Sequence, residues 1–225
     1  MKVELISKTE YCGSLFGDNT MVPQDLIIAI ARVSSEKTYE ERGNDVDKLL
    51  KYCMKNAHWS IFEMFNVCFY VETSLMVATQ MLRHKSLSFQ MLSQRYKTCS
   101  SLQPIELRLS SINGSRQSSE VVVGIGYNTL SEKISRVNET VMDLYTELID
   151  SGISRETARQ ILPQNTTTEL FVNGNIRSWI HYLEQRLSPH TQREHRKVAL
   201  LIQEKLIELM PLIFNTNGTE NKEIV

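Results

Sequence analysis

Between residues 130 and 148 the chain carries apolar side chains at the spacing of an α-helix. Six of them recur at intervals of 4-3-4-3-4: Leu130, Ile134, Val137, Val141, Leu144 and Leu148. This spacing places them on one stripe of a long helix, which Gly152 is suited to end. Such a stripe has to pack against other helices, either in the same chain or in another subunit. We therefore expect a helix-rich fold.

A β-strand is predicted earlier in the chain, at residues 65–73. Apolar and more polar side chains alternate through the segment FNVCFYVET, which is the period of a half-buried strand. Thr73 or Ser74 is suited to cap a following helix at residues 75–84, LMVATQMLRH. The strand thus leads into a helix that ends in a cluster of basic residues.

Further elements are predicted from composition and from helix-end signals. A short strand is expected near the N-terminus in the segment VELI. Pro23 and Asp25 suit the first turn of a helix in the next apolar segment. Additional helices are expected at residues 45–57, 154–162, 175–187 and 192–210. Together these elements indicate an α-rich α/β protein.

Residues 100–119 are rich in serine and contain a turn signal. Asn113-Gly114 lies between two apolar segments, so we expect a hairpin or an irregular insertion there. Beyond it, Gly124-x-Gly126 lacks the third glycine of a dinucleotide-binding fingerprint, and a β-bulge is the better interpretation.

The composition limits the kinds of partner that the protein attracts. The length of 225 residues and the hydrophobic content of 41% are typical of one soluble domain with a sizeable core. Lys and Arg number 25 and Asp and Glu number 26, so the net charge is −1. A chain with this balance has no overall basic field that would attract nucleic acid or a membrane surface. Any site for an anion has to be formed locally.

Export, membrane and metal signals are missing from the sequence. The four cysteines show no CxxC pairing, and the start MKVELISKTE has no apolar signal region. No apolar run approaches the roughly 20 residues that cross a bilayer. His190 and His195 have no acidic or cysteine companions at ligand spacing, so no metal site is expected. We therefore expect a soluble protein in the reducing cytoplasm.

The most specific motif is a basic cluster in the segment QMLRHKSLSFQMLSQRYK, residues 80–97. From Arg83 to Tyr96 it reads R-H-K-x7-S-x-R-Y. This resembles the signature of the flavin-dependent thymidylate synthases, R-H-R-x7-S followed by x-R-Y. A solvated helix end is the plain alternative for Arg-His-Lys alone, but it does not account for the rest of the motif.

The resemblance extends in order from ARVSS at residue 31 to about residue 192. Four more segments resemble family landmarks: H-x-S-x-x-E at residues 58–63, A-R-x-x-L-P at 158–163, N-x-R-S at 175–178 and L-x-x-R at 183–186. Several separate matches in one order are much more specific than one. Residues 102–127 match no part of the family pattern and are expected to be an insertion of this branch.

The resemblance implies a fold, a reaction and an assembly. The fold would be α/β, a helix-rich single domain at residues 1–215 with a mixed or antiparallel sheet, followed by a flexible tail at 216–225. The reaction would convert dUMP to dTMP with methylenetetrahydrofolate as carbon donor, FAD as hydride carrier and NADPH as reductant. The assembly would be a homotetramer whose active sites are shared between subunits.

Residue roles follow from the matched positions. The flavin is expected to contact Ser35, His58, Ser60, Glu63, Arg83, His84, Lys85, Asn175 and His181. The nucleotide is expected to contact Gln80, Gln90, Met91, Leu92, Ser93, Gln94, Arg95, Arg159 and Arg186. Arg186 and Ser93 are expected at the reacting ring. Arg186 would stabilise negative charge on the pyrimidine, and Ser93 would bind the nucleotide, in a wrapping loop, rather than attack it.

Two residues depart from the family pattern. Lys85 replaces an arginine and loses the planar fork that grips two oxygens at once. Met91 stands where the family commonly has a glutamate. These differences leave two other functions open: a related one-carbon transferase acting on a pyrimidine nucleotide, and a non-catalytic nucleotide-binding homologue.

Overall fold

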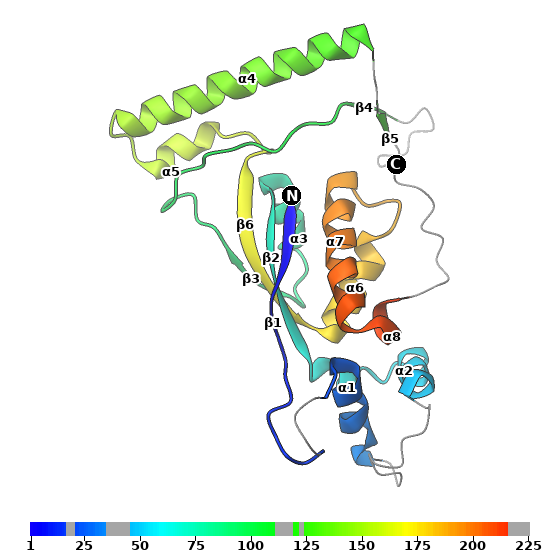
Figure 1. The fold of residues 1–225 in the computed structure, drawn as a ribbon. Helices are drawn as coiled ribbons and strands as arrows, with labels where there is room; N and C mark the ends of the chain where they lie inside the picture. The colour runs from blue at the N-terminus through cyan, green and yellow to red at the C-terminus, as the bar shows by residue number, and fades with distance from the viewer. Residues whose placement is uncertain (17–20, 35–45, 111–118, 122–123, 216–225) are drawn as a thin grey trace.

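The computed structural model of the chain describes residues 1–16, 21–34, 46–110, 119–121 and 124–215. Its centre is one antiparallel sheet covered on one face by helices (Figure 1). The strands follow the order β1 (Lys2–Lys8), β2 (Asn66–Ser74), β6 (Thr167–Asn175) and β3 (Ser88–Met91). The expected helix-rich α/β fold is confirmed, and of the two kinds of sheet the antiparallel one is present.

The helices lie against one face of this sheet and beyond its two ends (Figure 1). They are α1 (Pro23–Ala31), α2 (Val46–Lys55), α3 (Leu75–Met81), α4 (Ile125–Asp150), α5 (Arg155–Ala158), α6 (Ile176–Arg186), α7 (Arg193–Leu209) and α8 (Pro211–Phe214). Short 3-10 turns lie at η1 (Arg32–Ser34), η2 (Trp59–Glu63) and η3 (Arg159–Ile161).

The two central strands each lead directly into a capped helix. Strands β2 and β6 pair from Asn66 opposite Asn175 to Ser74 opposite Thr167. The Ser74 hydroxyl accepts a hydrogen bond from the Val77 amide at 3.3 Å, and Asn175 Oδ1 accepts one from the Ser178 amide at 2.9 Å. These caps satisfy free helix donors. Because the strands are antiparallel, α3 and α6 begin at opposite ends of the sheet.

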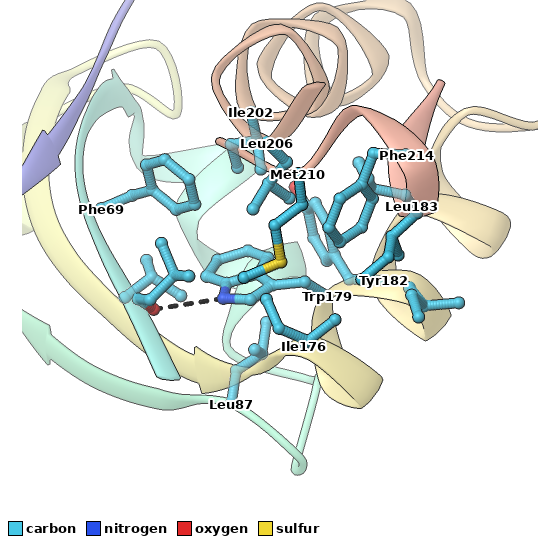
Figure 2. Close-up of a cluster of buried hydrophobic side chains, with 14 of the residues drawn as sticks. Phe69, Leu87, Ile176, Trp179, Tyr182, Leu183, Ile202, Leu206, Met210 and Phe214 are labelled. Atoms are coloured by element: carbon cyan, nitrogen blue, oxygen red, sulfur yellow. Dashed lines mark hydrogen bonds between the residues drawn. The ribbon is translucent and has the colours of Figure 1, made fainter. Parts of the chain in front are cut away.

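The main core lies between the covered face of the sheet and helices α6 and α7. Figure 2 shows Trp179 at its centre, beside Phe69 and below Met210. The indole Nε1 donates to the Val67 carbonyl at 3.1 Å, and the rings of Phe69 and Trp179 meet edge to face at 5.1 Å. The buried indole thus has both a packing partner and an acceptor, which fixes α6 against β2.

At Gly174, in β6, the side chain of Leu87 from the segment after α3 approaches the strand closely. A Cβ built on Gly174 would lie 2.3 Å from Leu87 Cδ2 and 3.5 Å from Trp179 Nε1. Leu87 is itself buried and belongs to the main core. Glycine at this position therefore lets the segment after α3 pack directly against β6.

The long helix α4 lies beyond the end of the sheet, away from the main core (Figure 1). Near its C-terminal end, Tyr145 packs with Cys99 and Ala158 in a second, smaller cluster. On its predicted apolar stripe, Leu130, Val137 and Leu144 remain 47%, 61% and 44% exposed. The stripe is therefore largely uncovered within one chain.

Several local predictions differ from the structure. Gly124 is not in a β-bulge: it has φ 147° and stands at the N-cap of α4, which begins at Ile125. Strand β6 was not expected, and Ser88–Met91 forms β3 instead of a loop. The hairpin alternative is supported by the pairing of β4 (Arg108–Ser110) with β5 (Ser119–Val121). Its predicted turn, Asn113-Gly114, lies outside the described residues.

Candidate functional site

The end of the basic motif meets the C-terminal end of α6. Arg186 Nε donates a hydrogen bond to His84 Nε2 at 2.7 Å, although the two residues are separated by 102 positions. An arginine is only a donor, so His84 has to accept with Nε2 and carry its proton on Nδ1. Burial, together with the positive charge of Arg186, lowers the pKa of His84 to about 4. His84 is therefore a neutral ring that holds Arg186 in place.

A second buried histidine stands behind this pair. His195 is fully buried, with Nδ1 3.1 Å from Gln80 Oε1 and Nε2 3.1 Å from the Tyr182 hydroxyl. Burial, and then the charge of Arg186, lowers the pKa of His195 to about 3. The Tyr182 ring also meets His84 edge to face at 4.9 Å. Two neutral imidazoles and a phenol thus form the wall behind Arg186.

A chain of polar side chains continues from Gln80 to the predicted insertion. Gln80 Nε2 donates to Gln192 Oε1 at 2.6 Å, and Gln192 Nε2 donates to Glu194 Oε2 at 2.9 Å. Glu194 Oε1 accepts from the guanidinium of Arg108, on β4. Burial opposes ionisation of Glu194, but its hydrogen bonds and Arg108 hold the pKa below its usual value. The insertion therefore contacts the proposed site through an ion pair.

A cleft of about 530 Å³ opens between η2 and α6. Its lining includes three residues predicted to contact the flavin, namely Glu63, Asn175 and His181. Glu63 forms an ion pair with Arg177, whose guanidinium lies 6.0 Å from the centre of the Trp59 ring. The cleft combines an aromatic wall with hydroxyl groups, an ion-paired cation and two carboxylates, those of Glu63 and Glu184.

The other residues predicted to contact the flavin lie around these elements. His58 and Ser60 flank Trp59 and are exposed, as are Arg83 and Lys85 beside the buried His84. Ser35 lies outside the described residues. The exposed cations at positions 83 and 85 are free of carboxylate partners among the described residues. They are accessible to an anion.

The remaining nucleotide candidates lie along β3 and the segment that follows it. Gln90 and Ser93 are exposed, whereas Met91 and Leu92 are half-buried. Met91 is opposite Leu170 and packs against the main core. The structure thus directs this side chain inward, where a glutamate would have to be desolvated.

Cationic residues also gather around α5. Arg95 forms a 3.0 Å ion pair with Glu156, and its amide donates to the Ser93 hydroxyl at 3.4 Å. Arg159 is half-buried in η3, next along the chain. Gln94 is buried and its Nε2 has no hydrogen-bond partner among the described residues. These predicted nucleotide residues form a group of their own, apart from the contacts of Arg186.

Sequence reasoning missed several residues that the structure places beside the candidates. These are Trp59, Ser86, Ser178, Ile180 and Glu184 in the cleft, and Arg108, Tyr182, Gln192, Glu194 and His195 in the polar chain. One signal was available for His195, because it precedes the buried Val198, Ile202 and Leu206 at helical spacing. A histidine on an apolar helix face indicates a buried polar contact.

Three of the four cysteines do not have the environment of a nucleophile. Burial raises the pKa of Cys53, Cys68 and Cys99 above the usual value. A raised pKa favours the unreactive thiol over the thiolate. Within the described ranges, no helix is long and apolar enough to span a membrane, and no group of three or more metal-binding side chains occurs.

Comparison with known proteins gives one consistent answer. The profile of the family described as "Thymidylate synthase complementing protein" matches residues 18–212. A flavin-dependent thymidylate synthase of Synechocystis sp. is 35% identical over 213 residues, covering 95% of this chain and 97% of the relative. A probable flavin-dependent thymidylate synthase of Paramecium bursaria Chlorella virus 1 is 36% identical over 214 residues, with coverages of 95% and 97%.

A solved structure agrees with these relatives. The crystal structure of a UMP/dUMP methylase, PolB from Streptomyces cacaoi bound with 5-Br dUMP, superposes with a TM-score of 0.79 at 25% sequence identity. The match covers 95% of this chain and 93% of that one. With a family profile over most of its length and two relatives above 30% identity, the chain belongs to the flavin-dependent thymidylate synthase family.

Proposed function

We propose that this protein is a methyltransferase that converts dUMP to dTMP, with FAD as cofactor and methylenetetrahydrofolate and NADPH as co-substrates. The names of two relatives that match it over nearly their whole length support flavin-dependent thymidylate synthesis. The two co-substrates follow from the resemblance of the sequence motifs to the family. The structural neighbour, a UMP/dUMP methylase bound to a dUMP analogue, supports a pyrimidine nucleotide as the acceptor.

The observation that carries the proposal is the state of Arg186. Its side chain is half-buried and donates to a neutral histidine, and within the described residues no carboxylate pairs with it. A partly desolvated cation without a counterion is costly unless a ligand supplies hydrogen-bond acceptors or negative charge. The terminal nitrogens of Arg186 are therefore suited to the oxygens of a bound pyrimidine, where they would stabilise developing negative charge.

The cleft between η2 and α6 fits a flavin in its chemistry. Trp59 offers an aromatic face, and Arg177 and His181 offer donors. Arg83 and Lys85 do not line the cleft, but they are exposed near Ser86, which does, and would offer charge for a diphosphate. Bound FAD would supply hydride transfer. The protein's own part would be to hold the cofactor and to shield the reacting groups from water.

Self-association belongs to the same proposal. The group around Ser93 and Arg95 and the group around Arg186 lie on separate elements, and the stripe of α4 is uncovered. A homotetramer in which one subunit's phosphate-binding residues face another subunit's Arg186 would bring both groups to one ligand. Such an assembly would also bury the exposed apolar side chains of α4.

One assay tests the proposed reaction. The purified protein, with added FAD, is incubated with dUMP, methylenetetrahydrofolate and NADPH, and the nucleotide product is identified by mass spectrometry. We expect dTMP to form only when all components are present. Formation of no dTMP by protein that is folded and loaded with flavin would refute the reaction.

The structural neighbour makes UMP a second acceptor to test. Because that protein is described as a UMP/dUMP methylase, UMP is supplied in a parallel reaction. A product from UMP alone would favour the related one-carbon transferase. Tight binding of either nucleotide without any methylated product would favour the non-catalytic homologue.

A further inference from the structure

A directional chain of hydrogen bonds runs through the wall behind Arg186. Its members are Tyr182, His195, Gln80, Gln192, Glu194 and Arg108. Histidine and glutamine side chains can each point two ways, so distances alone do not fix the positions of their protons. The groups that contact Gln192 do fix them.

Gln192 is held in one orientation by two neighbours that only accept. Its Nε2 lies 2.9 Å from a Glu194 carboxylate oxygen and 3.3 Å from the Met76 sulfur. A carboxylate and a thioether have no proton to donate. The amide nitrogen of Gln192 must therefore face both of them, and its oxygen must face Gln80.

The orientation of Gln192 decides every bond that follows. Since Gln192 Oε1 needs a donor, Gln80 presents Nε2 to it at 2.6 Å and turns Oε1 toward His195. That oxygen needs the Nδ1 proton of His195, 3.1 Å away, which leaves Nε2 to accept from the Tyr182 hydroxyl. A single carboxylate, Glu194, thus determines the tautomer of a histidine three side chains away.

We infer that Glu194, anchored by Arg108, is a positioning residue that sets which end of the Gln80 amide faces the bound nucleotide. This rests on the proposed function, in which Gln80 contacts the nucleotide. A reversed amide would exchange a donor for an acceptor at fixed places in the site and would leave ligand groups unpaired. Arg108 lies in the predicted branch insertion, so this segment acts on the site without touching the ligand.

The variant Glu194→Gln should reverse the direction of every hydrogen bond from residue 194 to Tyr182 and leave the positions of the side chains unchanged. The guanidinium of Arg108 would still require an oxygen, so the new amide would turn its nitrogen toward Gln192. Gln192 and then Gln80 would have to flip, because the Met76 thioether is too weak an acceptor to hold the Gln192 nitrogen alone. His195 would then move its proton from Nδ1 to Nε2. The matched control is Arg108→Met, which retains the carboxylate and should keep the original tautomer.

Two readouts are measured on the flavin-loaded protein. The first is the ¹⁵N chemical shift of the His195 ring nitrogens, which separates a protonated from a bare nitrogen. We expect a proton on Nδ1 in the wild type and in Arg108→Met, and on Nε2 in Glu194→Gln. The second is steady-state kinetics, in which Glu194→Gln should raise KM for dUMP about tenfold and change kcat by less than about threefold.

The outcomes are separable. Two results would overturn the directional chain of hydrogen bonds: a wild-type His195 protonated on Nε2, or an unchanged His195 tautomer in Glu194→Gln. The wild-type measurement tests the chain of hydrogen bonds even if the variant does not fold. A reversed tautomer with unchanged KM would show that the Gln80 amide does not face the nucleotide. Absence of dTMP formation by the wild type would refute the proposed function and leave the tautomer result intact.

Discussion

At the scale of single residues, the site depends on two histidines that stay neutral. Burial lowers the pKa of His84 to about 4 and that of His195 to about 3. Both rings use Nε2 as an acceptor, His84 from Arg186 and His195 from Tyr182. Protonation of His84 would set its Nε2 proton against the donor of Arg186, and protonation of His195 would place a buried charge near the same guanidinium.

This neutrality predicts how stability depends on pH. The unfolded rings bind protons below about pH 6.5, whereas the folded rings bind them only near their lowered pKa values. The unfolded state therefore binds more protons between these limits, and stability falls as the pH falls from 6.5 toward 4. Each histidine should contribute about 1.4 kcal/mol per pH unit to the free energy of unfolding within that window.

Urea unfolding at several pH values between 7 and about 4.5 measures this slope. His84→Gln should reduce the slope by about 1.4 kcal/mol per pH unit. A free energy of unfolding that does not change between pH 6.5 and 5 would contradict the neutral pair.

The two cationic positions at the site should have different functions. Arg186→Ala should lower dTMP formation by about 100-fold or more while FAD stays bound, because under the proposed function the guanidinium would act on the pyrimidine. Arg83→Ala should instead reduce the flavin content of the purified protein. Flavin absorbance per protomer and turnover are measured for both variants, with Lys51→Ala, on the exposed face of α2, as the control. Equal flavin loss in both would disprove this division.

At the scale of elements, one glycine allows the segment after α3 to pack directly against β6. Gly174→Ala would place a Cβ 2.3 Å from the buried Leu87 side chain. The resulting displacement should cost about 1–3 kcal/mol of stability. Gly126→Ala is the matched control, since nothing lies within 4 Å of a Cβ there. In the first turn of α4 it should be neutral or add up to about 1 kcal/mol.

Thermal or urea unfolding compares the two glycine variants. A loss of stability in Gly126→Ala equal to that in Gly174→Ala would show that backbone freedom, and not the contact with Leu87, explains the effect. A neutral Gly174→Ala would show that Leu87 moves aside at no cost.

The stripe of α4 makes a separate prediction about assembly. Val137→Asp combined with Leu144→Asp would place two charges on a face that the proposed homotetramer buries, and an unpaired buried charge costs several kcal/mol. The variant should sediment as a smaller species and lose activity. Ser135→Asp, on the opposite face of the same helix, should change neither property. A wild-type protein that sediments as a monomer would refute the assembly.

At the scale of the whole molecule, sequence reasoning identified the fold class because local patterns agreed with the final packing. The alternation at residues 65–73 and the stripe at 130–148 became β2 and α4. Strand β6 also alternates, with Thr168, Leu170 and Val172 buried, but its threonine-rich start and glycine near the end concealed it. Its role depends on two partner strands, which no local pattern shows.

The candidate site was predictable in part for the same reason. Motif positions identified Gln80, His84 and Arg186. In the structure Arg186 bonds His84, Gln80 bonds His195, and the two histidine rings lie 6.4 Å apart. The polar chain behind them was not predictable, because Arg108 and Glu194 come from segments 86 positions apart. A contact of that kind depends on how β4 meets the start of α7.

If the uncovered stripe of α4 forms the proposed assembly, the activity of this protein depends on its own concentration. Under the proposed assembly, an isolated protomer holds only part of each active site. Dilution would therefore dissociate the oligomer and remove complete active sites, as well as lower the protein concentration. Mass action then makes turnover per molecule rise with the amount of protein present. A cell that doubles its supply of this chain near the dissociation threshold would more than double its capacity to methylate the nucleotide.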